Sequence, residues 1–276
     1  MRTVKLPSGN VMPAFGLGTW GMGEDSRRKA QEAAALRYGL DLGLTLIDTA
    51  EMYAEGGAEE VVAEAIKGRR DEVFLVTKVY PHNAGRVSMV KSCEASLKRL
   101  GTDHVDLYLL HWRGLVPLAE TFEAFHALRE AGKIRDHGVS NFDRGDMIQS
   151  RQHDGGLVAT NQLYYNLARR GIEWDLLPWC GENGIPVMAY SPLDQGRVLD
   201  RTALRRVAAR HQVPTAQVAL AWLLNKDGVV PIPKSSNKDR VREFFHAQHL
   251  ALTAQDLDEL EVAFPPPSGP SPLEMT

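Results

Sequence analysis

The sequence predicts a (β/α)8 barrel, in which eight parallel strands are surrounded by helices, as one domain over residues 1–276. Short aliphatic or β-branched runs alternate with longer amphipathic stretches along the whole chain. Eight such runs fit within 276 residues, close to the ~250 residues of a typical α/β barrel. The sequence contains no linker, internal repeat or shift in composition that would mark a second domain.

The strand candidates are continuous apolar runs, a pattern typical of strands buried on both faces of a parallel sheet. In chain order they are 14–17, 44–47, 73–77, 105–110, 134–139, 157–161, 187–190 and 229–232. Ahead of them, residues 4–6 and 11–12 flank Ser8-Gly9-Asn10. This arrangement predicts an N-terminal β-hairpin that closes the bottom of the barrel.

Helix ends can also be predicted from the sequence. Ser26 is expected to cap a helix whose apolar residues recur every three or four positions. Gly43, Gly101 and Gly132 are placed to end helices in the left-handed conformation. Pro214 is expected to open an Ala/Leu-rich helix over 215–224.

Composition excludes several classes of protein. Lys and Arg number 32 against 35 Asp and Glu, so the charge pattern gives no footprint for nucleic acid or an anionic membrane. The first residues lack the apolar core of a signal peptide, and no stretch of ~20 apolar residues could span a bilayer. Two cysteines are too few for a disulfide framework, so a cytoplasmic location is expected. We expect a small-molecule substrate, no metal ion, and a monomer or weak oligomer.

The segment Gly16-Leu17-Gly18-Thr19-Trp20-Gly21 matches G-x-G-x-x-G, the dinucleotide-binding fingerprint of Rossmann folds. In that fingerprint the helix begins inside the motif, whereas here residues 22–25 intervene before Ser26. Trp20 would also crowd the approach of a pyrophosphate. A glycine-rich turn is therefore favoured, and a Rossmann-type dehydrogenase is kept as the structural alternative.

Polar side chains stand where predicted strands end, on the rim that carries the chemistry in (β/α)8 barrels. Asp48, Lys78 and His111 each directly follow a strand candidate, and Tyr53 lies on the loop beyond Asp48. Each alone has a structural explanation, as a helix cap, a solvated lysine, a satisfied histidine or a packed tyrosine. Their convergence on one rim favours a functional site.

These residue types together form a proton-donor site. A free phenol has a pKa of about 10, which a neighbouring lysine ammonium lowers, and a carboxylate beyond the lysine holds that cation in place. A neutral imidazole can orient a carbonyl oxygen. Reduction of a C=O group needs these functions, because hydride goes to the carbon and a proton goes to the developing alkoxide.

Ordered motifs along almost the whole chain resemble those of the aldo-keto reductases. They are Gly18-Thr19-Trp20, Leu46-Ile47-Asp48-Thr49-Ala50-Glu51-Met52-Tyr53, Val76-Thr77-Lys78-Val79, Leu97-Lys98-Arg99-Leu100-Gly101, Asp106-Leu107-Tyr108-Leu109-Leu110-His111-Trp112, Gly132-Lys133-Ile134-Arg135, Gly138-Val139-Ser140-Asn141-Phe142, Asn161-Gln162, Tyr190-Ser191-Pro192-Leu193 and Ile232-Pro233-Lys234-Ser235. The resemblance implies that Asp48, Tyr53, Lys78 and His111 are the catalytic tetrad.

The resemblance also implies NADPH, bound in extended form across the barrel mouth without a Rossmann fold. The implied cofactor contacts are Thr19, Trp20 and Asp48, then Ser140, Asn141 and Gln162 at the nicotinamide carboxamide, Tyr190 stacked on its ring, Ser191 and Leu193 over the pyrophosphate, Lys234, Ser235 and Arg240 at the 2′-phosphate, and Glu243 near the adenine. Phe244 departs from the family pattern, since many members have Asn there.

An aromatic substrate pocket is expected from Trp20, Tyr53, His111 and Trp112. The chain is short for the family and resembles its compact bacterial branch, which includes reductases for methylglyoxal and keto-sugars. The expected activity is therefore NADPH-dependent reduction of small aldehydes and ketones, with Tyr53 as proton donor. The functional alternative is a barrel that binds NADPH without turnover and acts as a redox-sensing subunit, and the intact tetrad argues against it.

Overall fold

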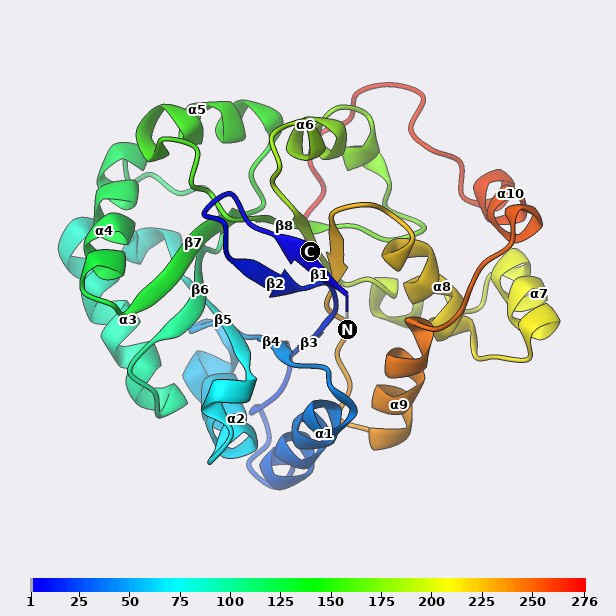
Figure 1. Cartoon of the computed structure of the whole chain (residues 1–276), viewed down its shortest axis with the longest axis horizontal. Coiled ribbons are helices and arrows are strands. Elements are labelled where there is room, and N and C mark those ends of the chain that lie inside the picture. The colour runs from blue at the N-terminus through cyan, green and yellow to red at the C-terminus, as the bar shows by residue number, and fades with distance from the viewer. Residues whose placement is uncertain (1) are drawn as a thin grey trace.

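The barrel is formed by eight parallel strands that follow one another in chain order around the sheet, in a computed structural model that describes residues 2–276 (Figure 1). The strands are β3 (Gly16–Gly18), β4 (Leu46–Asp48), β5 (Phe74–Val79), β6 (Val105–Leu110), β7 (Ile134–Ser140), β8 (Asn161–Tyr164), β9 (Val187–Tyr190) and β10 (Val229–Pro231). The N–H of Gly18, the last residue of β3, donates to the carbonyl of Pro233, two residues beyond β10, at 2.9 Å and joins the two edges. The predicted (β/α)8 fold is confirmed.

A β-hairpin lies across one end of the barrel, as predicted (Figure 1). Its strands are β1 (Thr3–Lys5) and β2 (Val11–Pro13), which pair antiparallel. Leu6 and Met12 pack against the apolar side chains inside the barrel. The Asn10 side-chain amide donates to Asp136 on β7 at 2.8 Å, so a polar contact also fastens the hairpin to the barrel wall.

The helices surround the barrel in Figure 1. They are α1 (Lys29–Leu42), α2 (Gly57–Ile66), α3 (Arg86–Leu100), α4 (Leu118–Glu130), α5 (Arg144–Asp154), α6 (Leu176–Glu182), α7 (Thr202–His211), α8 (Thr215–Leu224), α9 (Lys238–Ala247) and α10 (Ala254–Ala263). Gly43 and Gly101 end α1 and α3 with φ of 95° and 66°, the predicted left-handed caps. Within residues 2–276, no helix has the length and apolar character needed to cross a membrane.

Most strand ends differ from the prediction by one or two residues, and two predicted features, the cap at Ser26 and the strand over 157–161, are wrong. Ser26 does not cap α1, because a turn closed by the Arg28 N–H and the Asp25 carbonyl at 2.9 Å delays the helix to Lys29. The strand predicted over 157–161 is instead β8, from Asn161 to Tyr164. Val158 and Ala159 are buried and the Ala159 N–H donates to the His137 carbonyl of β7 at 2.8 Å, but the regular strand begins only at Asn161.

The G-x-G-x-x-G run owes its glycines to barrel packing. A Cβ on Gly16 would lie 2.2 Å from the Leu46 side chain, and one on Gly18 would lie 2.9 Å from the Ile232 carbonyl oxygen. Both glycines lie within β3, and the next helix begins only at Lys29. The Rossmann alternative is therefore wrong, since its fingerprint needs a helix that begins inside the motif.

A buried carboxylate ties α2 to the strand that carries Lys78. Glu59 accepts hydrogen bonds from the Thr77 hydroxyl at 2.6 Å and from the Arg99 guanidinium at 2.5 Å, and its side chain is fully buried. Thr77 points outward to this carboxylate, so its neighbour Lys78 points inward. Glu59 thus fixes β5 from outside the barrel.

We predict that Glu59→Ala lowers the free energy of unfolding by about 3 kcal/mol or more, because it leaves buried partners of a charged group unpaired. Glu60→Ala is the matched control, since Glu60 pairs with Lys29 at 2.6 Å but is 54% exposed. It should cost less than about 1 kcal/mol. Denaturant unfolding of both variants measures the difference, and equal losses would contradict the role given to Glu59.

Candidate active site

The structure brings Asp48, Tyr53, Lys78 and His111 together at the barrel mouth. Asp48 is the last residue of β4, Lys78 lies inside β5, and His111 directly follows β6. Tyr53 begins a short helical turn, Tyr53–Gly56, that leads into α2. The strands thus extend further than predicted, so Asp48 and Lys78 are held by the sheet itself rather than by loops.

Lys78 is the centre of this cluster, and its side chain is fully buried. Its Nζ donates to Asp48 Oδ2 at 2.8 Å, to the Thr49 carbonyl at 2.8 Å and to the Tyr53 hydroxyl at 3.1 Å. An ammonium group has three N–H donors, and these contacts use all of them. Gln162 Nε2 donates to the other Asp48 oxygen at 2.7 Å, so the carboxylate is held from both sides.

The charges of the cluster determine where its protons lie. Burial lowers the pKa of Lys78, but the Asp48 carboxylate and the Tyr53 hydroxyl raise it by more, so the net direction is upward. Burial raises the pKa of Asp48, which Lys78 and then Gln162 oppose. We conclude that the lysine stays protonated and the carboxyl ionised, because their 2.8 Å contact stabilises both charged forms.

The pKa of the Tyr53 phenol shifts in the opposite direction to the one expected from the sequence. Burial raises its pKa, the Lys78 ammonium lowers it, and Asp48 raises it again, with a net upward direction. The expected lowering by lysine is therefore present but is outweighed by burial. At neutral pH the phenol carries its proton, although the Lys78 ammonium keeps its pKa lower than burial alone would set it.

His111 is neutral in this site. Burial, and then the positive charge of Lys78, lower the pKa of His111 to about 2. Its ring meets the Tyr53 ring edge-on at a centroid separation of 5.7 Å, and its Nδ1 has no hydrogen-bond partner among the described residues. A neutral imidazole has one N–H donor and one acceptor nitrogen, so the ring can still donate a hydrogen bond to a carbonyl oxygen.

The backbone beside Tyr53 is strained. Ala54 and Glu55, with φ of 51° and 52°, take the left-handed conformation that costs L-residues about 1–2 kcal/mol each. The turn is fixed by its neighbours, because Gly56 packs against the Arg99 side chain, which itself bonds Glu59. Strain held in this way is characteristic of functional sites.

A cavity of about 1080 Å³ opens over the cluster and contains nearly all predicted site residues. Those that line it are Thr19, Trp20, Asp48, Tyr53, His111, Trp112, Ser140, Asn141, Gln162, Tyr190, Ser191, Leu193, Lys234, Arg240 and Glu243. Lys78 and Ser235 do not line it. Lys78 lies beneath Tyr53 and Asp48, and the Ser235 hydroxyl accepts the Asn237 N–H at 3.1 Å within its own loop.

Further lining residues were not predicted. They are Gly18, Gly21, Glu24, Arg28, Met52, Pro192, Gln195, Gly196, Leu199, Pro214, Thr215, Ala216, Ile232, Pro233, Phe244, Met275 and Thr276. Gly18, Met52, Pro192, Ile232 and Pro233 lie within family-like motifs that did not indicate them as cavity residues, and Phe244 had been noted only as a departure from the family pattern. Most of the others come from loops and from the C-terminal segment, where neither periodicity nor a motif indicates which side chains face the mouth. Their identification requires the folded chain.

The polar groups at one end of the cavity are already ordered. The Tyr190 hydroxyl donates to Asn141 Oδ1 at 2.9 Å, and the Asn141 amide donates to Ser140 Oγ at 3.2 Å. One side of the Tyr190 ring stacks on Tyr164 at 5.5 Å with 5° between planes. Tyr190 lines the cavity and Tyr164 does not, so the other face of the Tyr190 ring is available for stacking.

The other end of the cavity is basic. Lys234 and Arg240 line it, and neither forms an ion pair with a described carboxylate. Asn237 caps α9 there by accepting the N–H groups of Asp239 and Arg240 at 2.8 and 3.3 Å. Free cations beside a helix start suit a phosphate group.

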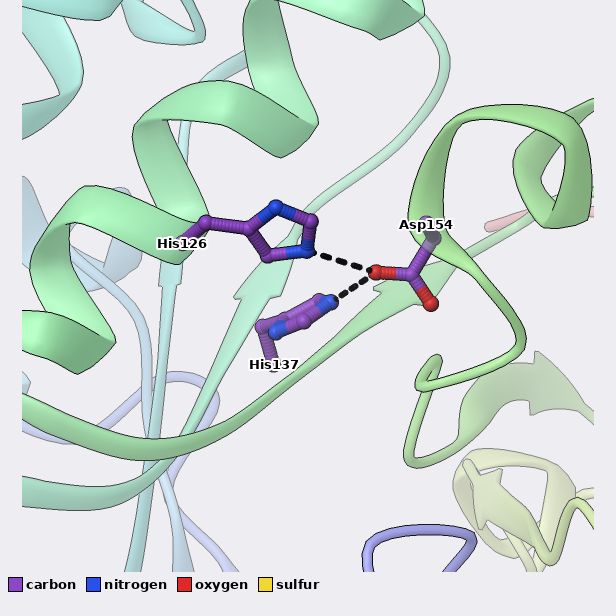
Figure 2. Close-up of side chains that lie close together, drawn as sticks. All are labelled: His126, His137 and Asp154. Carbon is purple, nitrogen blue, oxygen red and sulfur yellow. Dashed lines mark hydrogen bonds and ion pairs between the residues drawn. The ribbon is translucent and has the colours of Figure 1, made fainter.

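A separate cluster of His126, His137 and Asp154 lies between α4, β7 and α5, outside the barrel (Figure 2). Asp154 Oδ1 contacts His137 Nε2 at 2.5 Å and His126 Nε2 at 3.3 Å. Two ligands of one tetrahedral zinc ion stand about 3.3 Å apart, given metal–ligand distances of about 2.0–2.1 Å. The His137 contact is therefore a hydrogen bond. His137 Nδ1 also lacks the acceptor that metal-bound histidines normally have.

The Aldo/keto reductase family profile matches residues 14–263. Methylglyoxal reductase YeaE of Escherichia coli is 50% identical over 275 residues, covering 97% of each chain. Glyoxal reductase of Bacillus subtilis is 34% identical, covering 99% of this chain and 97% of its own. An aldo-keto reductase of Klebsiella pneumoniae crystallised with NADPH is 49% identical with a TM-score of 0.96, covering 100% of this chain and 99% of that one.

The chain belongs to the aldo/keto reductase family. It is an oxidoreductase that uses NADP(H), and the alternative of a barrel without turnover is set aside. The residues fit this cofactor, since the long cavity has ordered amide and hydroxyl groups at one end and unpaired cations at the other.

We predict that His111 shows no protonation step between about pH 5 and 8, the range in which an ordinary imidazole gains its charge. Its pKa is lowered to about 2, so it is already neutral throughout that range. An NMR titration of the histidine ring protons measures this, with the His111→Gln spectrum identifying the signal. A chemical-shift step of that signal near pH 6.5 would contradict a neutral His111.

Proposed function

We propose that the protein reduces small aldehydes and ketones, such as methylglyoxal and keto-sugars, with Tyr53 as proton donor. One observation carries the proposal: the Tyr53 hydroxyl lies 3.1 Å from the buried Lys78 ammonium and faces a cavity that His111 also lines. The 50% identity to the methylglyoxal reductase of E. coli supports the substrate class.

The site residues divide the chemistry among them. NADPH, when bound, supplies a hydride to the carbonyl carbon. As the C=O electrons move onto oxygen, the Tyr53 O–H gives its proton to that oxygen, leaving an alcohol and a phenolate. Lys78 stabilises the phenolate through the contact already present, and Asp48 keeps Lys78 in place. The neutral His111 holds the carbonyl oxygen near Tyr53.

The substrate end of the cavity suits small, flat carbonyl compounds. Trp20 and Trp112 line it, and the Trp112 ring lies 5.0 Å from that of His111. Met275 and Thr276 also line the cavity, and Arg169 holds the preceding Glu274 at 2.7 Å. The aromatic rings beside His111 suit a small, flat carbonyl compound, which favours a methylglyoxal-sized substrate over a steroid-sized one.

Cytoplasmic location and a monomeric or weakly oligomeric state stay predictions. Cys93 and Cys180 are both free and buried, and burial raises the pKa of each thiol to about 12. Neither is a reactive thiolate, which agrees with a reducing compartment. The expected absence of a metal ion and of a nucleic-acid partner also stays a prediction.

Tyr53→Phe tests the proposed proton donor. The change keeps the ring and removes the hydroxyl, so kcat/KM for methylglyoxal with NADPH should fall by about 10²–10⁴-fold. The Kd for NADPH, followed by tryptophan fluorescence, should change little. Near wild-type kcat in this variant would rule out Tyr53 as the donor.

Tyr80→Phe is the matched control. The Tyr80 ring lies near Trp112, but Tyr80 itself does not line the cavity, so the change removes a phenol outside the site.

The same assay run over a panel of aldehydes, keto-sugars and steroid ketones tests the substrate class. Small carbonyls should give the highest kcat/KM values. A steroid as the best substrate would contradict that part of the proposal.

Lys234 and Arg240 are expected to bind the 2′-phosphate that distinguishes NADPH from NADH. Each charge-assisted contact contributes about 1.5–3 kcal/mol, so Lys234→Ala or Arg240→Ala should raise the Kd for NADPH about tenfold or more. The Kd for NADH should hardly change. Arg242→Ala on the same helix is the control, because Arg242 pairs with Asp239 at 3.0 Å. Equal affinities of the wild-type protein for NADPH and NADH would contradict a 2′-phosphate site at Lys234 and Arg240.

A further inference from the structure

A third cation reaches the basic end of the cavity from the opposite end of the chain. Arg28 takes the N-cap position of α1, where no side chain caps the helix, and it lines the same cavity as Lys234 and Arg240. Its Nη2 donates to the Ser236 hydroxyl at 3.1 Å, so the guanidinium spans from α1 to the loop before α9. Gln31 supports this contact by donating to the Ser236 carbonyl at 3.3 Å.

Arg28 lacks a close carboxylate partner. Among the described residues its nearest carboxylate is Glu32, which forms a long ion pair in which Oε1 lies 3.9 Å from Arg28 Nε, while Oε2 of the same buried carboxylate accepts the Gly23 N–H at 2.9 Å. By contrast, the adjacent Arg27 forms an ion pair with Asp25 at 2.8 Å. Within residues 2–276, Nη1 of Arg28 makes no hydrogen bond or ion pair, so its donors are available to bind an anion.

The acidic groups facing this end are Glu24 and Glu243, which line the cavity, and the buried Glu32. Burial lowers the pKa of Lys234 and the positive charge of Arg28 lowers it further, whereas Glu32 and Glu24 raise it. This end of the lining thus has three cations, Arg28, Lys234 and Arg240, and two carboxylates, and Arg28 and Lys234 repel one another. A phosphate dianion between them would remove that repulsion.

We propose that Arg28 is a ligand of the 2′-phosphate of NADPH, which it binds from the α1 side while Lys234 and Arg240 bind from the α9 side. This inference rests on the proposed assignment of Lys234 and Arg240 to that phosphate. A guanidinium presents a planar fork of donors that matches phosphate oxygens, and the Ser236 contact orients it in advance. Family motifs did not indicate Arg28, because it lies outside them and 208 positions from Ser236.

The arrangement also gives a reason for rejecting NADH. Without the 2′-phosphate, the binding energy of these cations is lost and Arg28 stays close to Lys234 with no anion between them. Discrimination then comes from direct attraction of the phosphate to the cations, together with relief of the part of their repulsion that Glu32 and Glu24 do not already offset. Arg28 is therefore a residue for cofactor choice, with no part in the proton transfer at Tyr53.

Arg28→Ala and Arg28→Lys test the proposal, with Arg27→Ala as the matched control. The Arg27 side chain is 87% exposed and does not line the cavity. Kd values for NADPH, NADH, 2′,5′-ADP and 5′-AMP are measured by calorimetry or by quenching of tryptophan fluorescence. Arg28→Ala should raise the Kd of NADPH and of 2′,5′-ADP about tenfold or more, and change that of NADH and of 5′-AMP less than about twofold.

Arg28→Lys should lose less affinity than Arg28→Ala, and Arg27→Ala should match the wild type. An unchanged NADPH affinity in Arg28→Ala would overturn the proposal while leaving the site at Lys234 and Arg240 intact. Equal weakening of NADPH and NADH would overturn it too, by showing that Arg28 shapes the loop. If only Arg28→Ala weakened NADPH, Arg28 would be supported and the roles of Lys234 and Arg240 would fail.

Discussion

The buried ammonium of Lys78 is the constraint on which the rest of the site depends. With no exposure to water, its three donors need acceptors within the protein, and Asp48, the Thr49 carbonyl and Tyr53 supply them. This requirement fixes the end of β4 and the turn that holds Tyr53. Outside the barrel, Glu59 bonds Thr77, the residue before Lys78, and so sets which face of β5 the lysine occupies.

Burial and charge act in opposite directions in this cluster, and the structure gives their balance. From the sequence, the lysine alone predicts a lowered phenol pKa, because neighbouring charges can be inferred from motifs. The depth of burial cannot be inferred from motifs, and here burial raises the pKa of Tyr53 by more than Lys78 lowers it. The same burial keeps His111 neutral. The site therefore holds a protonated phenol and a neutral imidazole beside a permanent cation.

Most of the fold could be predicted because continuous apolar runs and glycine caps at helix ends are local signals. Val105–Leu110 and Val187–Tyr190 coincide with their predicted strands, and the proximity of Asp48, Tyr53, Lys78 and His111 could be predicted because strand ends meet on one rim. The predicted cap at Ser26 was wrong because a turn delays the start of α1 to Lys29. The predicted strand over 157–161 was wrong because regular pairing begins only at Asn161. Arg28 and Met275 could not be found, since long-range packing alone brings them to the cavity.

The bond between Gly18 and Pro233 closes the barrel beside the basic end of the cavity. The walls there come from residues 18–28 and from residues 232–244, so neither part of the chain forms the cofactor cleft alone. A growing chain on the ribosome consequently cannot capture NADPH until its last barrel strand has been made. Once bound, cofactor at 100 times its Kd adds about 2.7 kcal/mol to stability, and this acts against separation of the two ends. Cofactor retention therefore requires that residues 232–244 have been made and that the barrel has closed.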